Sequence, residues 1–482
     1  MLFNSIEFLL FLPVVFLMYW YVLGKNLKLQ NFFILVASYV FYGWWSWRFL
    51  LLIFFTSCCS FYSGILLQRV GRDRNRKWIS GINIVLNLGI LVVYKYYDFF
   101  VVNLVEAFRS IGVSLSLSSL NLVLPVGISF YTFQALSYTI DVYKRKLEPT
   151  RDIVSFLSFI SFFPQLVAGP IERATNLLPQ FLRRRVFNYE DAVSGCRQVL
   201  WGFFKKVVIA DNCASVVNVI FDSSSSDQSG STLLLGAIFF TFQIYGDFSG
   251  YSDIAIGTGK LFGIRLMRNF NIPYFSRDIA EFWRRWHISL NTWFRDYVYI
   301  PLGGSHGRKS RVIRNTFVIF LVSGLWHGAN WTFLAWGGYH SLLFVPLVLL
   351  GKNRKNVDNI GRKSLLPGFR ECFQILCTFV LVMFGWIIFR AQDIGHAFEY
   401  MKGIFTRTLF SYPSHLGPDE LMTTFMILLL LGFEWINRDK EFGLDFHGLH
   451  LPRFIRYTVY AGLSCCIYFF GGSQETFIYF QF

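Results

Sequence analysis

The sequence has little charge for its length. Of its 482 residues, 15% are Asp, Glu, Lys or Arg, whereas 54% are hydrophobic. A soluble globular chain carries about 25% charged residues, so this composition excludes an ordinary water-soluble domain. The apolar residues also form blocks close in length to the roughly 20 residues that span a bilayer core as a helix. We therefore expect an all-α polytopic membrane protein with a single integral-membrane domain over residues 1–482.

Motifs for metals and nucleotides are also missing. The eight cysteines show no C-x-x-C spacing. Cysteines within apolar segments are mostly small packing residues, so we expect no disulfide framework and no metal site. The stretch "GTGK" (257–260) does not meet the spacing G-x-x-x-x-G-K-[ST] of a phosphate loop, which argues against an NTPase.

The apolar blocks predict about 11 to 13 transmembrane helices. The first block lacks a basic start and a small-residue cleavage site, so we expect it to remain as a span rather than to be removed as a signal. The predicted spans are 2–23, 29–46, 48–67, 79–101, 121–143, 192–221, 231–249, 313–326, 331–351, 371–390, 420–436 and 455–471. Two interrupted segments, 152–170 and 280–303, are expected to be re-entrant or interfacial around a protein-lined cavity.

Basic residues are unevenly distributed over the loops. Lys and Arg gather at 71–77, 143–146, 183–185, 307–314 and 352–355. Loops rich in Lys and Arg are expected on the cytoplasmic side, which places the N-terminus and the segment 472–482 outside the cytoplasm. The net charge of +16 then indicates contact with anionic lipid headgroups rather than with nucleic acid.

One histidine lies within an apolar span. His327 occurs in "SGLWHGANWTFLAWGGYH" (323–340), where the surrounding glycines would thin the helix walls as a channel requires. An ionisable residue in a span is costly and suggests function, and histidine is the usual proton acceptor near neutral pH. His327 is therefore a candidate general base, and a buried packing histidine is the alternative. Asn330 and the indole N–H of Trp326 are candidates for stabilising an oxyanion.

A second histidine lies in a basic, tryptophan-rich stretch. His287 occurs in "FWRRWHISLNTWFRDYVYIPLGG" (282–304) together with Arg284, Arg285 and Arg295. Arginine forks match phosphate oxygens, so this stretch is a candidate mouth for a phosphate-bearing donor. The alternative is an interfacial aromatic belt with snorkelling arginines.

Carboxylates and small residues occur together at 243–263. Asp247 and Asp253 are unusual because isolated carboxylates are costly in lipid. The motifs Gly246-x-x-x-Gly250 and Gly259-x-x-x-Gly263 favour close helix packing. Gln165 lies in "SFFPQLVAGPIER" (161–173), where prolines predict a bent segment that lines a cavity.

Six stretches taken together, in order, resemble the membrane-bound O-acyltransferase superfamily, and closely its bacterial alginate O-acetyltransferase branch. They are "MLFNSIEFLLFLPVVF", "LPVGISFYTFQALSYTIDVYK", "FFPQLVAGPIER", "QIYGDFSGYSDIAIG", "FWRRWHISLNTWFRDYVYIPLGG" and "GLWHGANWTFLAWGGYH". The resemblance covers nearly the whole chain. It implies a ring of tilted helices around a thinned central funnel, which Asp247, Asp253 and Gln165 would line. It also implies a catalytic His327 and a second family histidine at His287.

The same resemblance implies a reaction and its participants. An acetyl group would pass from a cytoplasmic thioester, acetyl-CoA or an acyl carrier protein, with no tightly bound cofactor. The arginines of 282–304 would hold the donor's phosphates. The acceptor would be an extracytoplasmic polysaccharide such as alginate, with cellulose and peptidoglycan as alternatives. A hydrolase-like partner of the SGNH type would act on this polysaccharide outside the bacterial inner membrane.

The stretch "FIYFQF" (477–482) places one tyrosine, Tyr479, among aromatic and apolar residues. In the related teichoic-acid D-alanylation system a small partner peptide ends in a similar tail with a proposed role as acyl relay, so Tyr479 is a candidate relay in cis. About eleven extended residues reach roughly 35 Å, whereas half a hydrocarbon core is about 15 Å. The alternative is an interfacial aromatic anchor.

Two other functional classes fit parts of the sequence. A flippase for a polysaccharide precursor could use Asp247, Asp253 and His327 as proton or substrate contacts, but the chain has no clear internal repeat. A structural scaffold would make His327 dispensable.

Overall fold

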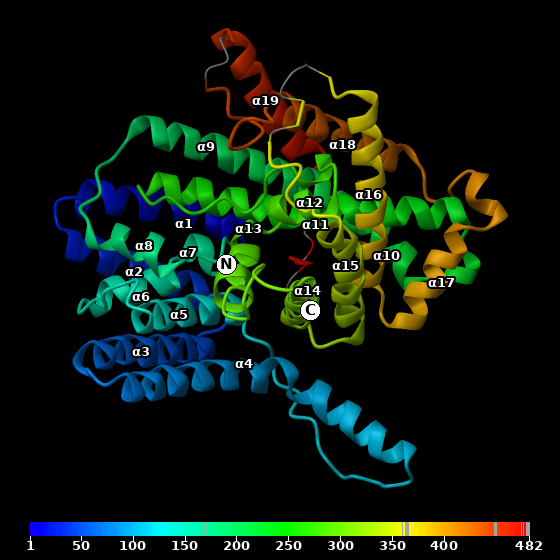
Figure 1. Ribbon diagram of the computed structural model, residues 1–482. Coiled ribbons are helices and arrows are strands. Elements are labelled where there is room, and N and C mark those ends of the chain that lie inside the picture. The colour runs from blue at the N-terminus through cyan, green and yellow to red at the C-terminus, as the bar shows by residue number, and fades with distance from the viewer. Residues whose placement is uncertain are drawn as a thin grey trace. The chain divides into compact units, whose positions relative to one another are not determined.

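The computed structural model describes residues 1–167, 169–358, 360–361, 366–447, 451–473, 475 and 477–478. Within these ranges every regular element is a helix (Figure 1). Among the described residues, five helices are long and apolar enough to cross a membrane, by length and composition: α3 (Arg48–Arg69), α4 (Asp73–Ser110), α11 (Gly230–Leu261), α15 (Trp331–Leu349) and α16 (Phe369–Arg390). The prediction of an all-α multi-pass membrane protein is therefore confirmed.

The chain forms two compact units. The first contains residues 1–192 and 258–266, and the second contains residues 193–257 and 267–482. Besides α3 and α4, the first unit contains α1 (Ile6–Leu17), the π-helical turn η1 (Met18–Val22), α2 (Leu27–Gly43), α5 (Ile128–Tyr143), α6 (Ile153–Ser161), α7 (Phe163–Leu166) and α8 (Ala174–Leu182). The helix α9 (Tyr189–Phe203) begins in it.

One arginine side chain bonds to the C-terminal ends of two helices in the first unit. Arg76 of α4 donates hydrogen bonds to the carbonyls of Leu67, Val142 and Tyr143, at the ends of α3 and α5. These carbonyls have no partner within their own helices, so one guanidinium satisfies two helix ends. The three helices α3, α4 and α5 pack side by side (Figure 1).

The predicted re-entrant segment 152–170 is a broken helix pair. The Asp152 side chain caps α6, and the backbone turns at Phe162 before Pro164 enters the first turn of α7. Proline fits there because it has no N–H to satisfy. Gln165 lies in this short helix, where its Nε2 donates to the carbonyl of Phe159 at 2.9 Å. The structure thus bonds Gln165 within its own segment of the first unit.

The second unit contains the remaining helices. They are η2 (Phe204–Ala210), α10 (Asp211–Asp222), η3 (Ser225–Asp227), η4 (Pro273–Phe275), α12 (Ile279–Arg285), α13 (Ile288–Phe294), η5 (Arg295–Tyr299), α14 (Lys309–His327), α17 (Ile394–Ile404), η6 (Arg407–Phe410), α18 (Pro418–Ile436) and α19 (Arg453–Phe469), with α11, α15 and α16. Most predicted spans coincide with helices. The prediction 231–249 was too short, because α11 continues to Leu261.

Glycines of α11 allow this helix to pack closely against α9. A Cβ at Gly250 would lie 2.8 Å from the carbonyl oxygen of Gly202, and one at Gly257 would lie 2.5 Å from that of Gly195. Small residues let α9 and α11 approach closely, as Gly246-x-x-x-Gly250 predicted. The interpretation of Gly259-x-x-x-Gly263 was wrong. It forms the turn that ends α11, with Gly263 at φ +69°, a conformation that glycine adopts readily.

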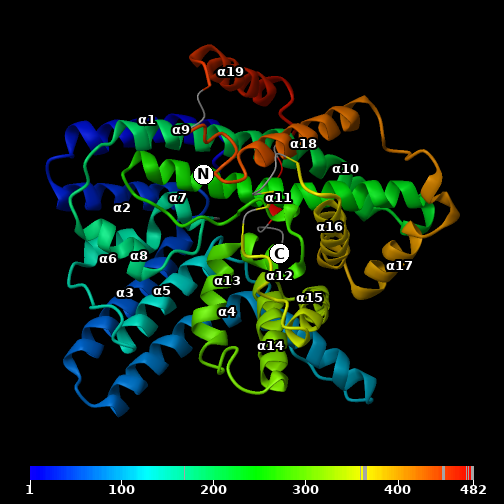
Figure 2. The same cartoon turned by 45° about the horizontal axis from the view of Figure 1, so that its top comes forward.

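The hairpin of α14 and α15 carries His327 at its tip. The two helices lie side by side in both views (Figure 1 and Figure 2). A Cβ at Gly324 would lie 2.2 Å from the carbonyl oxygen of Phe333, and one at Gly337 would lie 2.4 Å from that of Phe320. These glycines therefore allow two helix backbones to touch, which differs from the predicted thinning of a channel wall.

Candidate functional site

His287 lies at a break between two short helices. The helix α12 ends at Arg285 and α13 begins at Ile288, and His287 between them has φ +44°. A positive φ is strained for a residue with a Cβ and occurs preferentially at functional sites. The ring is 1% exposed and packs edge-on against Phe248, with 4.6 Å between ring centroids. The segment 280–303, predicted to be re-entrant or interfacial, consists of the short helices α12, α13 and η5.

A hydrogen bond fixes the tautomer of His287. Its Nδ1 lies 3.0 Å from the Oδ1 of Asn269, which can only accept, so Nδ1 carries the proton. The amide of Asn269 is held in turn, because its Nδ2 donates to the Oγ of Ser252 at 3.0 Å. The Oγ of Ser289 donates to the same Oδ1 at 2.9 Å. Nε2 of His287 is therefore left as a lone-pair acceptor.

The environment of His287 keeps its ring neutral. Burial lowers the pKa of His287 to about 3, because the charged form loses its hydration. Among the described residues its Nε2 has no hydrogen-bond partner. A neutral ring with a buried acceptor nitrogen is suited to accepting a hydrogen bond from a hydroxyl group.

His327 ends α14 inside an aromatic cluster. Its ring is 5.1 Å from that of Trp326 and 5.2 Å from those of Trp336 and Phe389, between centroids. Trp326 also contacts the ring of His287 at 5.9 Å. The structure thus brings both predicted histidines and Trp326 together within the second unit, although the two histidines lie 40 residues apart in the sequence.

Asn330 caps the next helix. Its Oδ1 accepts from the backbone N of Thr332 at 3.0 Å, and its Nδ2 donates to the carbonyl of Gln392 at 3.1 Å. An asparagine at this position satisfies an otherwise unpaired N–H at the start of α15. Both polar groups of the Asn330 side chain therefore have structural partners.

The predicted carboxylates form ion pairs with two consecutive lysines. Asp253 lies 2.5 Å from the Nζ of Lys205, and Asp247 lies 2.7 Å from the Nζ of Lys206. Lys206 also pairs with Asp211 at 2.8 Å. Both lysines belong to η2, and pairing offsets the cost of burying these charges. Sequence reasoning missed the lysines, although the doublet in "LWGFFKKVVIA" (200–210) was a visible signal.

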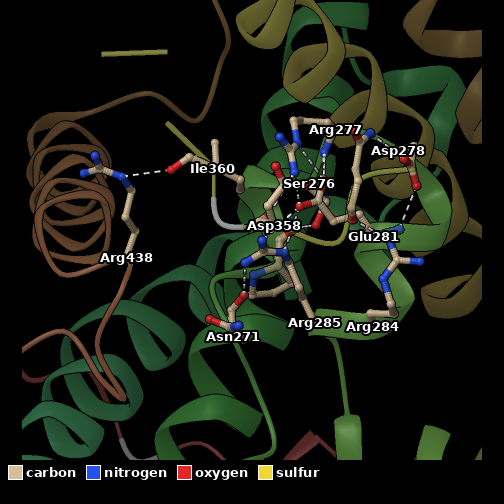
Figure 3. Close-up of polar contacts among 12 residues, drawn as sticks. Asn271, Ser276, Arg277, Asp278, Glu281, Arg284, Arg285, Asp358, Ile360 and Arg438 are labelled. Atoms are coloured by element: carbon tan, nitrogen blue, oxygen red, sulfur yellow. Dashed lines mark hydrogen bonds and ion pairs between the residues drawn. The ribbon is translucent and has the colours of Figure 1, made fainter. Parts of the chain in front are cut away.

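The basic stretch of α12 forms an internal network (Figure 3). Arg285 and Arg277 both pair with Glu281, at 2.9 and 3.0 Å. Arg284 is exposed and donates to the carbonyls of Asn353 and Asn356. The third predicted arginine, Arg295, lies beyond this network and pairs with its neighbour Asp296 at 2.7 Å.

A charged pocket borders the network of His287. It is small, with a cavity volume of about 20 Å³, and its lining includes Asn269, which bonds His287, together with Lys205, Asp253, Arg268 and Glu434. The aromatic residues Trp201, Tyr245, Phe270 and Phe442 form much of the remaining wall. The pocket therefore combines charged, polar and aromatic side chains beside a buried histidine.

The segment after α19 enters the same region. Phe477 is 0% exposed, and its ring lies 4.4 Å from that of Tyr251 and 6.0 Å from that of Phe248, between centroids. Phe248 is the ring that contacts His287. The predicted relay residue, Tyr479, lies outside the described residues.

Known proteins resemble this chain over much of its length. A family model described as "MBOAT, membrane-bound O-acyltransferase family" matches residues 144–384. The chain is 40% identical over 409 residues to a probable alginate O-acetylase of Pseudomonas aeruginosa, covering 84% of this chain and 75% of that protein. It is 33% identical over 433 residues to a peptidoglycan O-acetyltransferase of Helicobacter pylori, covering 84% and 80%.

A third relative is named for a different polymer. The chain is 28% identical over 292 residues to a teichoic acid D-alanyltransferase of Bacillus subtilis, covering 57% of this chain and 71% of that protein. These comparisons favour an acyltransferase over a flippase or a scaffold. The chain belongs to the membrane-bound O-acyltransferase family and is an acyltransferase of the multi-pass membrane type.

Proposed function

We propose that this acyltransferase moves an acetyl group from a cytoplasmic thioester toward an extracytoplasmic polysaccharide such as alginate. The observation that carries the proposal is the meeting of two buried histidines at Trp326. The names of the relatives, which include an alginate O-acetylase and a peptidoglycan O-acetyltransferase, support a polysaccharide acceptor. The donor is acetyl-CoA or an acyl carrier protein thioester.

The reaction is attack of a hydroxyl group on a thioester carbonyl. His327 takes the hydroxyl proton as the oxygen forms its bond to the carbonyl carbon. The tetrahedral oxyanion then collapses, the C–S bond breaks, and the proton passes to the leaving thiolate. A positioned base of this kind contributes about 10²–10⁴-fold to the rate.

Neighbouring side chains would support this step. The indole N–H of Trp326 and the amide of Asn330 are the candidate oxyanion donors. The Nδ2 of Asn330 would have to leave the carbonyl of Gln392 to act, which favours Trp326 for this role. The neutral His287, with Nε2 as acceptor, would orient the attacking hydroxyl group.

Tyr479 is proposed as an acyl relay. It directly follows Ile478, whose backbone bonds to Asp247, and Phe477 packs beside the aromatic ring that contacts His287. In a first step the phenol oxygen would displace the thiol and form an ester, with its proton passing to the thiolate through His327. In a second step an acceptor hydroxyl group would attack the ester and regenerate the phenol.

The exposed arginines indicate where the donor would bind, and the expected membrane orientation indicates where a partner would act. Arg284 and Arg295 are exposed and would contact phosphates of the donor, whereas the charge of Arg285 is offset by Glu281. The basic loops would face the cytoplasm and both termini would lie outside the bacterial inner membrane. An SGNH-hydrolase-like partner would then pass the acyl group to the polymer.

The test replaces His327 by alanine and measures the acetyl content of the cell's polysaccharides by mass spectrometry. The expected result is loss of acetylation with normal amounts of membrane-inserted protein. His340→Ala is the matched control, because His340 is equally buried and contacts Trp336 from the same hairpin. Near-normal acetylation by His327→Ala, or equal loss in both variants, would refute the assignment of His327.

A further inference from the structure

The segment that follows α19 is held by its main chain. The backbone N of Gly472 donates to the carbonyl of Val207 at 3.2 Å. The Nδ2 of Asn212 donates to the carbonyl of Phe470 at 2.7 Å. Both partners lie in or next to the π-helical turn η2, and π-helical turns occur frequently at functional sites.

Two charged side chains form hydrogen bonds to the backbone of the next part of the segment. The Nζ of Lys206 donates to the carbonyl of Glu475 at 3.2 Å, and the backbone N of Ile478 donates to the Oδ2 of Asp247 at 2.7 Å. Lys206 and Asp247 are themselves an ion pair, with side chains 2% and 4% exposed. Hydrogen bonds to charged groups are stronger than neutral ones, and burial strengthens them further.

These contacts fix the backbone position of the segment 475–478 and do not involve the segment's side chains. One bond holds a carbonyl and the other holds an N–H three residues later, so the backbone is fixed at both ends of the interval 475–478. Phe477 adds an aromatic contact to Tyr251 within that interval. A slip of one residue would break both main-chain bonds and move the ring.

We propose that Lys206 and Asp247 are positioning residues that clamp the backbone at Glu475 and Ile478, directly before the proposed relay. This inference rests on the proposed relay at Tyr479. The pair touches the backbone of the segment and acts on the reaction through Tyr479. Its role differs from the predicted one, in which Asp247 lines a funnel that the acyl group crosses.

Lys206 and its two carboxylate partners offer a matched pair of variants for a test. Lys206 pairs with two carboxylates, Asp211 at 2.8 Å and Asp247 at 2.7 Å. Asp247→Ala removes the acceptor of the Ile478 amide but leaves Lys206 paired with Asp211. Asp211→Ala makes the same change in charge and leaves Asp247 bonded to Lys206 and to Ile478. The two variants therefore differ in whether they release the tail.

The experiment measures hydrogen exchange of the C-terminal peptide in the purified full-length protein. Asp247→Ala should speed the exchange of amides 475–478 by at least about tenfold, because a buried charge-assisted hydrogen bond is lost. Asp211→Ala should change it by less than about twofold. Ile478→Pro deletes the donor N–H and also restricts the local backbone, and it should likewise speed exchange at 475 and 477. Ile478→Ala also shortens the side chain but keeps the donor, and it should have a smaller effect.

Acetyl transfer is measured on the same samples. Faster exchange together with reduced transfer in Asp247→Ala and Ile478→Pro supports both the clamp and the relay. Faster exchange with undiminished transfer supports the clamp and overturns the relay. Unchanged exchange in both variants, or equal acceleration in Asp211→Ala, overturns the clamp.

Discussion

The Nδ1 of His287 lies 3.0 Å from the Oδ1 of Asn269, and this bond decides the chemistry of the ring. A neutral amide accepts the Nδ1 proton without stabilising an imidazolium as a carboxylate would. The ring therefore stays neutral, and its Nε2 points away from Asn269 as an acceptor. The bond to Asn269 and the edge-on packing against Phe248 hold the ring in this orientation.

Replacing Asn269 by aspartate should alter the pH dependence of acyl transfer. A carboxylate at this position favours the charged ring and raises the pKa of His287 above its value of about 3. The protonated ring cannot accept at Nε2, so the acid limb of the rate profile should move to higher pH by at least about one unit. The loss of activity should grow as the pH falls toward the raised pKa of His287.

The control for this change is Ser289→Ala. It removes the second hydrogen bond to the Oδ1 of Asn269 and leaves the bond to His287. Its pH–rate profile should match that of the unmodified protein. An unshifted profile in Asn269→Asp would show that the protonation of His287 does not limit the reaction.

Much of the helical framework could be predicted from the sequence. The predicted span 313–326 lies within α14 (Lys309–His327), because its apolar run ends where polar residues begin. The end of α11 was missed, because glycines at 250 and 257 that suggest an interruption instead allow contact with α9. A local pattern does not reveal which helix a glycine will face.

The candidate site could be predicted in part. His287 and His327 were found because histidine is rare within apolar sequence, and the structure places them at one tryptophan. The clamp was missed, because Lys206 meets Asp247 only through tertiary packing over 41 positions. The buried lysine doublet in η2 was visible, but its partners were not.

Replacing Tyr479 by phenylalanine separates the relay from the anchor. Phenylalanine keeps the aromatic ring that an interfacial anchor requires and removes only the hydroxyl group that would carry the acyl group. We expect loss of polymer acetylation, measured by mass spectrometry, at an unchanged amount of protein. Tyr479→Ala serves as the comparison, because it removes both the ring and the hydroxyl group. Full acetylation by Tyr479→Phe would leave the anchor as the role of this residue.

Replacing Gly324 by alanine should damage the hairpin that carries His327. The new Cβ would lie 2.2 Å from the carbonyl oxygen of Phe333, so α14 and α15 must move apart. Overpacking of this kind costs about 1–3 kcal/mol and would displace the histidine three residues later. Thermal unfolding in detergent and acetyl transfer should both show a loss. Gly338→Ala in α15 is the control, because its Cβ meets nothing within 4 Å, and it should be neutral or stabilising.

Removing one partner of the Lys205–Asp253 ion pair should strongly destabilise the second unit. The two charges lie 2.5 Å apart, and their side chains are 3% and 14% exposed. Breaking a buried pair by removing one partner costs about 3–5 kcal/mol, because the other charge is left uncompensated. Lys205→Met and Asp253→Asn should therefore each lower the free energy of unfolding by several kcal/mol, as measured by denaturation in mixed micelles.

The double variant distinguishes a true pair from two independent polar contacts. Removing both charges leaves no uncompensated ion, so Lys205→Met with Asp253→Asn should cost less than the sum of the single changes by at least about 1 kcal/mol. Asp253 also accepts from the Nε2 of Gln198 at 2.8 Å, and asparagine retains an acceptor for that bond. The coupling therefore isolates the ion pair. Strict additivity of the two changes would mean that Lys205 and Asp253 contribute separately, through Ser249 and Gln198, rather than through each other.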